Sequence, residues 1–450
     1  MASELIGADR AREVLEAALE VDGVDGVEVL LFHEWGGLTR FAESAIHQST
    51  WREDTGVRIR VVTDGRVAVA STNELTPEGA AQAAANAKEM AEVSSPDPLF
   101  PGLAPHAAVP DKDAFDEATA AVTPGGRAEG VAAIVGQCAD GFDAAGSYET
   151  SASEVALLNS EGQFCYSPTT QASVTTLVSG GDGGAGYVEA WSMSSGGLDL
   201  EAVGRRAARK AVDSRGPRDL EPGPYEVVLE PTAVATLVAF LAYLGFGGRA
   251  LAEGRSCLSG KDGQRVAAPS ISIGDDAFAP GMPGAPFDFE GTPKRRVDLI
   301  RDGVFAGGVY DRRTAKQVGR ESTGHALPAP NPEGPFPLNL VMEPGDASLE
   351  DMIASTERGL LVTRFHYSNV VHPIESIITG MTRDGTWLVE GGQIAHPVKN
   401  LRFTQSILEA LRGTQMVGRE TEMVSEFFFS ASRVPSLKLQ SFQFTGRSDH

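Results

Sequence analysis

Hydrophobic and polar positions in the first part of the chain follow helical spacing once and strand spacing three times. In residues 9–19 the apolar side chains recur at intervals of three and four, which predicts a helix. Residues 27–32 form a short apolar run that predicts a strand. Residues 57–62 and 66–70 flank an Asp-Gly step at Asp64, so they predict a β-hairpin.

Two helix starts share one device, a threonine followed by a proline. Thr76-Pro77 and Thr123-Pro124 each offer a capping hydroxyl before a proline at the first helical position. They predict an Ala-rich helix to about residue 93 and a second helix to about residue 138. The proline-rich residues between them predict a loop over 94–110. Further segments predict strands at 152–158 and 163–178 and a helix at 198–212.

The clearest break in the pattern is residues 214–224, where prolines and glycines exclude a helix or a central strand. After it, residues 225–230 predict a strand and residues 231–244 an apolar helix, followed mainly by short strands. We therefore expect two domains, 1–213 and 225–450, joined by this linker. The order is not a steady strand–helix alternation, so it predicts an α+β fold: an N-terminal α/β sandwich-like half and a β-rich C-terminal half.

Composition restricts the class of protein further. The chain has 450 residues, 42% of them hydrophobic, and 38 basic against 61 acidic residues give a net charge of −23. Such a charge repels phosphate backbones and anionic membranes, so no nucleic acid and no membrane are expected as partners. Three cysteines far apart exclude a disulfide scaffold, and the start lacks the pattern of a secretory signal. We expect a soluble cytoplasmic protein.

His33-Glu34 resembles the beginning of the HExxH zinc signature, in which two histidines one helical turn apart bind the metal. The remaining positions are not histidines, and the glycines at 36 and 37 are poor helix residues. The interpretation is a strand end and a turn.

A second candidate metal site is the late group of His366, His372 and His396. Three imidazoles can hold a catalytic zinc that keeps an open position. However, His366 and His372 lie in segments that look like strands, and His396 precedes a proline in an expected loop. Solvated or hydrogen-bonded histidines are the alternative interpretation. The residues alone give no complete active site.

Segments along nearly the whole chain resemble the TldD/PmbA family, a metallopeptidase system also described as modulators of DNA gyrase. They follow the family's order and spacing: residues 40–48 (RFAESAIHQ), 54–66 (DTGVRIRVVTDGR), 286–291 (PFDFEG), 311–316 (DRRTAK), 321–326 (ESTGHA), 380–386 (GMTRDGT) and 390–403 (EGGQIAHPVKNLRF).

The resemblance is to the PmbA branch of the family, also called TldE. The TldD branch carries a HExxxH helix and a late cysteine that hold a metal. Here residues 231–249 contain no His, Glu, Asp or Cys, and no cysteine follows Cys257. The resemblance therefore implies a chain with no metal and no catalytic residue of its own, and zinc or a similar metal in a partner subunit.

The function that the resemblance implies is that of a partner subunit. It would complete, with a TldD-like HExxxH-bearing subunit, a heterodimeric chamber in which unfolded or precursor peptides are cleaved. Phe427, Phe428 and Phe429 are candidates for an interface or for peptide binding. Two alternatives stay open: an autonomous homodimeric hydrolase that uses the late histidines, and a non-enzymatic regulator of gyrase-type proteins.

Overall fold

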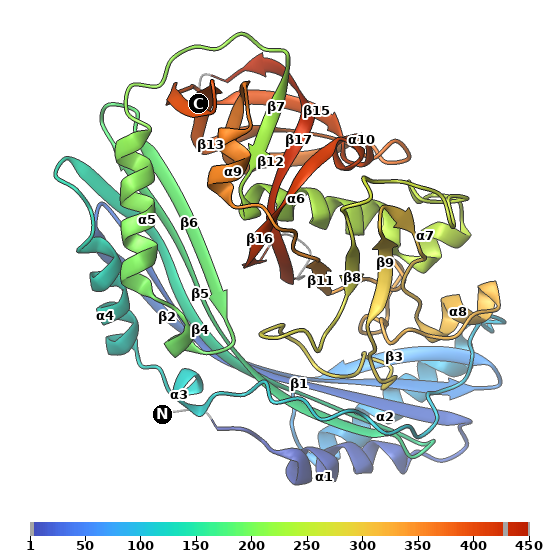
Figure 1. The fold of residues 1–450 in the computed structure, drawn as a ribbon. Coiled ribbons are helices and arrows are strands. Elements are labelled where there is room, and N and C mark those ends of the chain that lie inside the picture. The colour runs from blue at the N-terminus through green and yellow to red at the C-terminus, as the bar shows by residue number, and fades with distance from the viewer. Residues whose placement is uncertain (1–3, 426–430, 449–450) are drawn as a thin grey trace.

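The N-terminal half of the chain forms one long, curved antiparallel sheet. A computed structural model describes residues 4–425 and 431–448. Six strands lie in the order β3-β2-β1-β4-β5-β6 (Figure 1). Their bounds are β1 Gly26–Ala42, β2 Ala45–Thr63, β3 Arg66–Thr72, β4 Phe142–Asn159, β5 Phe164–Gly180 and β6 Ala185–Ser192.

Helices cover the outer side of this sheet, and the C-terminal half lies on the other side (Figure 1). Helices α1 (Ala8–Leu19) and α2 (Pro77–Val93) cover one end, and α4 (Pro124–Val135) and α5 (Leu200–Asp213) cover the other. The small alanines on the buried face of α2 let the helix pack closely on the strands. Short helical turns lie at α3 (Glu117–Ala120) and η1 (Ser195–Gly197).

Local sequence signals in this half are confirmed. The Thr76 and Thr123 hydroxyls accept hydrogen bonds from the amides of Gly79 and Gly126, which caps α2 and α4. Strands β2 and β3 form the expected hairpin, and Asp64 has a φ of 48° in its turn.

The interpretation of His33-Glu34 as a strand end and turn is wrong, because both residues lie inside β1. The strand continues through Gly36 and Gly37 for a tertiary reason. A Cβ atom added to Gly37 would lie 2.0 Å from Nη2 of Arg127, a fully buried arginine on α4. The glycine therefore makes room for a buried side chain.

The C-terminal half is built on an eleven-stranded sheet, and five of its strands pair in a closed ring. Strands β17, β15, β13, β12 and β7 each pair with the next, and β17 pairs again with β7. Their bounds are β7 Pro224–Leu229, β12 Arg358–His372, β13 Ile377–Glu390, β15 Leu401–Ser406 and β17 Ala431–Arg447. The remaining strands are β8 Ile273–Asp275, β9 Val297–Arg301, β10 Val304–Phe305, β11 Asn339–Met342, β14 Gln393–Pro397 and β16 Thr414–Ser425.

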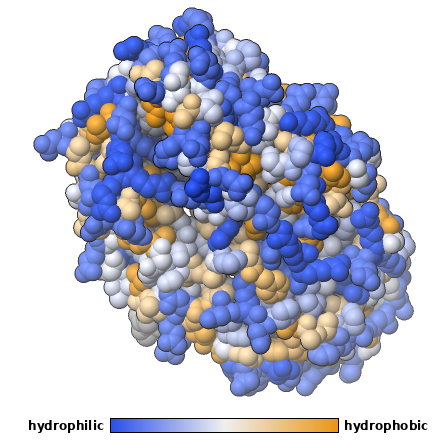
Figure 2. Space-filling view, viewed as in Figure 1, coloured by the Kyte–Doolittle hydropathy of each residue, from blue (hydrophilic) through white to orange (hydrophobic). Residues whose placement is uncertain are grey.

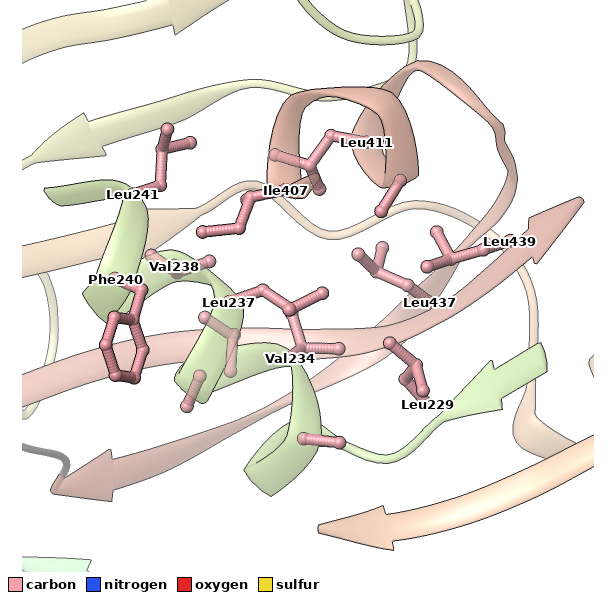
Figure 3. Packing of buried hydrophobic residues seen from close by; sticks show 14 of the residues in the cluster. Leu229, Val234, Leu237, Val238, Phe240, Leu241, Ile407, Leu411, Leu437 and Leu439 are labelled. Atoms are coloured by element: carbon pink, nitrogen blue, oxygen red, sulfur yellow. The ribbon is translucent and has the colours of Figure 1, made fainter. Parts of the chain in front are cut away.

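The largest hydrophobic core lies in this half and contains α6 (Pro231–Leu241). Leucines and valines of α6 face leucines of β7 and β17 and the short helix α10 (Ile407–Arg412) (Figure 3). The expected apolar helix ends as a π-helical turn, Ala242–Phe246, before α7 (Gly248–Ala252). Helices α8 (Arg312–Val318) and α9 (Leu349–Ala354) complete the half.

The predicted α+β class, with its β-rich C-terminal half, is confirmed. The surface in Figure 2 is mainly hydrophilic, with hydrophobic side chains in small scattered groups. Within residues 4–425 and 431–448, no helix has the length and apolar character needed to cross a membrane.

Candidate functional site

The candidate site lies beside helix α6. Pro231 occupies its first position, where a missing N–H breaks no helical hydrogen bond. Every side chain from Ala233 to Leu241 is buried. Two threonines lie one turn apart, and Oγ1 of Thr236 donates to the carbonyl of Thr232 at 3.3 Å. These two side chains line a cavity outside the apolar core.

This cavity, the α6 cavity, has a volume of about 440 Å³ and lies where the two halves of the chain meet. Strand β6 of the N-terminal sheet forms one wall, and β12 with α6 forms the other. The lining residues are Tyr187, Glu189, Thr232, Thr236, Arg364, Phe365, His366, Tyr367, Ser368 and Ser425.

A row of polar contacts fixes the wall between β6 and β12. Arg364 Nε donates to Oδ2 of Asp384 at 2.8 Å, and the guanidinium carbon lies 3.9 Å from the ring centre of Tyr187. The Tyr187 hydroxyl donates to Oε2 of Glu189 at 2.8 Å. These contacts join β6 of the N-terminal half to β12 of the C-terminal half, so they fix the side chains of the cavity wall in place.

Burial and neighbouring charge set the protonation of this wall. Burial raises the pKa of Glu189 above its ordinary value, although the hydrogen bond from Tyr187 lowers it in part. Burial lowers the pKa of His366, and the positive charges of Arg364 and Arg383 lower it further. The imidazole is therefore neutral at neutral pH and offers one donor and one acceptor.

The three late histidines lie in different surroundings. His366 lines the α6 cavity, whereas exposed His372 accepts a hydrogen bond from the Glu375 amide at 3.3 Å. Nδ1 of His396 contacts the carbonyl of Pro397 at 3.1 Å. Strand β13 separates them, because His366 pairs with Met381 and His396 with Leu388.

Met381 and Leu388 are about 23 Å apart at the usual rise of a strand. In the described part of the chain, no three His, Cys, Asp or Glu residues gather as a metal site would require. Phe427, Phe428 and Phe429 lie outside the described residues.

Comparisons with known proteins cover almost the whole chain. Three models of the PmbA/TldA metallopeptidase match it in order: domain 1 at residues 27–91, the central domain at 87–215 and the C-terminal domain at 222–446. The chain belongs to the PmbA/TldD metallopeptidase family. The six-stranded sheet thus carries both the first and the central domain of the family.

Individual relatives agree with this assignment. Metalloprotease PmbA of Escherichia coli O157:H7 is 25% identical over 95% of each chain. A metalloprotease of Methanothermobacter thermautotrophicus is 27% identical, over 61% of this chain and 62% of its own length.

Two solved structures share the fold. TldE from Thermococcus kodakarensis has a TM-score of 0.89 at 22% identity, over 97% of this chain and all of its own. A Thermotoga maritima protein described as a candidate modulator of a DNA gyrase has a TM-score of 0.86 at 20% identity, over the same shares.

Membership in a metallopeptidase family implies a metal, and the residues of α6 do not fit one. By the family resemblance described above, α6 corresponds to the helix that carries the HExxxH ligands in the TldD branch. Residues 231–249 offer only hydroxyl groups of threonine and tyrosine as polar side chains before Arg249. Zinc in proteins is bound by thiolate, imidazole and carboxylate groups, so no zinc-mediated step can be assigned to this helix.

The family-like segments that carry charge meet at a different place, a buried cluster that we call the seam. Arg60 of β2 contacts two carboxylates: its Nη1 donates to Oε1 of Glu290 at 3.2 Å, and its Nε lies 3.4 Å from Oε1 of Glu28. The amide of Arg312 donates to Glu290 at 3.3 Å. Oδ2 of Asp288 accepts from the amide of Ala326 at 2.9 Å. The seam joins the N-terminal sheet to loops of the C-terminal half.

Burial dominates the electrostatics of the seam. It raises the pKa of Glu28 to about 7, against the lowering effect of Arg60. It also raises the pKa of Asp288, and the Glu290 charge adds to this rise. The sequence analysis missed these residues as a cluster. Segments 54–66, 286–291 and 311–316 each contain charged residues, but the sequence does not show that the fold brings these residues together.

Proposed function

We propose that this chain is the subunit without its own metal site in a heterodimeric, cytoplasmic metallopeptidase. The metal, zinc or a similar ion, would belong to a TldD-like HExxxH-bearing subunit. The role of this chain would be to complete the chamber around that metal and to hold unfolded or precursor peptides.

The observation that carries the proposal is the combination found at α6. The helix keeps its place beside a polar cavity between the two halves, but its side chains there are Thr232 and Thr236 rather than metal ligands. A chain that had only lost its metal ligands would not need hydrogen-bonded polar side chains in the wall beside this helix. The row from Asp384 through Arg364 to Glu189 supports a binding role for the cavity.

The cavity has the chemistry to bind a peptide backbone. Neutral His366 and the hydroxyls of Ser368 and Thr232 can exchange hydrogen bonds with amide groups, without a preference for one side chain. Strand β12 pairs with β7 only over residues 359–362, and no other described strand follows that edge of residues 363–372. An extended peptide can add to β12 there, because backbone pairing is independent of sequence.

The test is assembly with an HExxxH-bearing relative from the same genome. Coexpressed and purified, the two chains should form a stable heterodimer and hydrolyse an unfolded protein such as casein. The exposed cavity residue Tyr367, 75% accessible, should matter for peptide affinity, so Tyr367→Ala should raise KM.

A matched control is Val93→Ala at the end of α2, which is 86% accessible and should leave KM unchanged. Two results would contradict the proposal. One tightly held zinc per chain in this protein alone, lost in the His366→Ala, His372→Ala double variant, would favour the autonomous hydrolase. Copurification with gyrase in place of the HExxxH-bearing chain would favour the regulator.

A further inference from the structure

A second cavity, the linker cavity, lies where the linker between the two halves meets β6 and β13. It has a volume of about 420 Å³, and its lining includes Ala185 of β6 and Pro217 of the linker. Two of the family-like segments, 380–386 and 390–403, supply most of the C-terminal wall. The α6 cavity uses neither segment, so their role is still to be explained.

The linker cavity has an excess of positive charge, although the whole chain carries a net charge of −23. Its lining contains two cations, Arg383 and Lys399, and one carboxylate, Asp384. This carboxylate accepts a hydrogen bond at 2.8 Å from Nε of Arg364, which belongs to the wall of the α6 cavity. The one negative charge of the lining is therefore already paired with a cation from outside it.

Both cations of the lining keep donors for a ligand. Nε of Arg383 lies 3.6 Å from Oδ1 of Asp384, too far for a hydrogen bond, and its guanidinium makes no hydrogen bond in the described part of the chain. Lys399 lies 3.2 Å from Asp219, but both side chains are more than half exposed, so this ion pair contributes little energy. A guanidinium without a fixed partner can bind both oxygens of a carboxylate.

A buried hydroxyl in the same lining also lacks a partner. Thr386 is 2% accessible, and its Oγ1 makes no hydrogen bond to any residue that the structure describes. Buried hydroxyl groups are normally hydrogen-bonded, because an unsatisfied one costs free energy. An anion beside Arg383 would give this hydroxyl an acceptor.

We propose that the linker cavity binds the terminal carboxylate of a peptide, with Arg383 as the main contact and Lys399 and Thr386 as further donors. One uncommitted guanidinium matches a single negative charge, and the field of a strongly acidic chain disfavours a dianion such as phosphate. The volume lies in the range of pockets for organic ligands. Ala185, Pro217 and other small apolar side chains of the lining can pack against the rest of the terminal residue.

The test compares N-acetyl-trialanine with the same peptide carrying a C-terminal amide, by isothermal titration calorimetry on the full chain alone. The free acid should bind at least about tenfold more tightly, because the amide forms no charge-assisted hydrogen bonds with Arg383. Backbone binding in the α6 cavity is common to both peptides, so the ratio of the two affinities isolates the carboxylate contact. The result is therefore independent of the proposed peptidase role.

Arg383→Gln should bring this ratio close to one. The matched control is Arg358→Gln on β12, which changes the net charge by the same amount. Nε of Arg358 also lies beside a carboxylate, 3.7 Å from Oε1 of Glu390, but outside the lining of the linker cavity. This control should keep the preference for the free acid.

The hydroxyl contact has its own pair of variants. Thr386→Val should lower the ratio about threefold, as loss of one hydrogen bond does. Thr363→Val removes another buried hydroxyl without a partner among the described residues, on β12 and outside the lining, and should leave the ratio unchanged.

Equal affinities for the free acid and the amide would overturn the proposal, as would a preference that survives in Arg383→Gln. Inorganic phosphate and acetate provide a second comparison, as competitors of the free-acid peptide. Acetate should displace the peptide at least as well as phosphate does. Displacement by phosphate at a lower concentration would show a phosphate site and contradict the assignment to a peptide carboxylate.

Discussion

The α6 cavity and the seam both lie between the two halves of the chain, but they differ in how they use charge. In the seam, Glu28, Arg60 and Glu290 are all at most 9% accessible, and Arg60 contacts both carboxyls directly. In the cavity, Arg364 stacks on a tyrosine, and the imidazole of His366 is held neutral. Both regions border an open volume: Arg60 and Glu290 of the seam line a cavity of about 460 Å³, and the α6 cavity has a volume of about 440 Å³. They differ in their lining, because the seam is centred on a buried guanidinium between two carboxyls, whereas the α6 cavity is lined mainly by hydroxyl, aromatic and imidazole groups.

The difference suggests separate roles for the two regions: ion pairs of the seam connect the two halves, and under the proposed function the α6 cavity binds the peptide. Buried charges near a domain boundary often indicate a catalytic site, since perturbed pKa values gather there. Here two carboxyls whose pKa is raised to about 7, Glu28 and Asp288, are fully buried in protein. The less charged cavity is the better candidate for binding. Five variants, in three comparisons, test these roles.

A large loss of stability is expected from removing the cation of the seam. Arg60→Met leaves Glu28 and Glu290 buried without their guanidinium partner and should lower the free energy of unfolding by about 3 kcal/mol. Denaturant unfolding measures the change.

Arg58→Met is the matched control for this prediction. Arg58 lies two residues away on the same strand and is exposed, so its loss should change stability by less than about 0.5 kcal/mol. Equal effects of the two variants would show that the seam does not stabilise the fold.

The apolar and polar faces of α6 should respond differently to truncation. Leu237 is fully buried in the core, so Leu237→Ala should cost about 2–4 kcal/mol in unfolding free energy. Thr232→Ala on the cavity face should cost less than about 1 kcal/mol but raise KM for an unfolded peptide in the assembled enzyme. If Thr232→Ala lowered stability more than Leu237→Ala, or if only Leu237→Ala raised KM, the assignment of the functional face of α6 to the cavity side would be contradicted.

A smaller effect is expected from the pH dependence of the seam. The folded pKa of Glu28, about 7, lies above the ordinary value of 4.5, so the folded state binds the extra proton between these values. The contribution of Glu28 to stability therefore rises as pH falls through 7 and levels off below the unfolded pKa. Between about pH 8 and pH 5 the gain should be on the order of 2 kcal/mol.

Glu28→Gln isolates this contribution, because the amide does not titrate. His33, whose pKa is also raised, by its contacts with Glu154 and Glu53 against the effect of burial, adds a gain of the same sign in both proteins. The free energy of unfolding should thus depend less on pH in Glu28→Gln than in the wild type. Parallel pH profiles would contradict the assigned role of Glu28.

Sequence patterns predicted the elements whose signals are local. The Thr-Pro steps at residues 76 and 123 placed the starts of α2 and α4 at the correct residue, because capping and proline geometry need only neighbours. The apolar helix at residue 231 was predicted for the same reason. The length of β1 was missed, because Gly36 and Gly37 are explained only by Arg127, which lies about ninety residues later in the chain.

The candidate site could be predicted only in part. The lack of metal ligands on α6 is visible in the sequence, and His366 was named, although for a metal rather than for the wall of the α6 cavity. Glu189 and Arg364 were not identified, since they come from strands 175 residues apart that the fold brings together. The seam required the same long-range information.

The measurement that tests the central claim most directly is peptidase activity of the separate and combined subunits, with metal analysis of each. This chain alone should bind no stoichiometric zinc and leave casein intact. Its HExxxH-bearing relative should hold the metal, and mixing the two should produce hydrolysis that a chelator removes. Zinc-dependent hydrolysis by this chain alone, or full activity of the relative without it, would contradict the account.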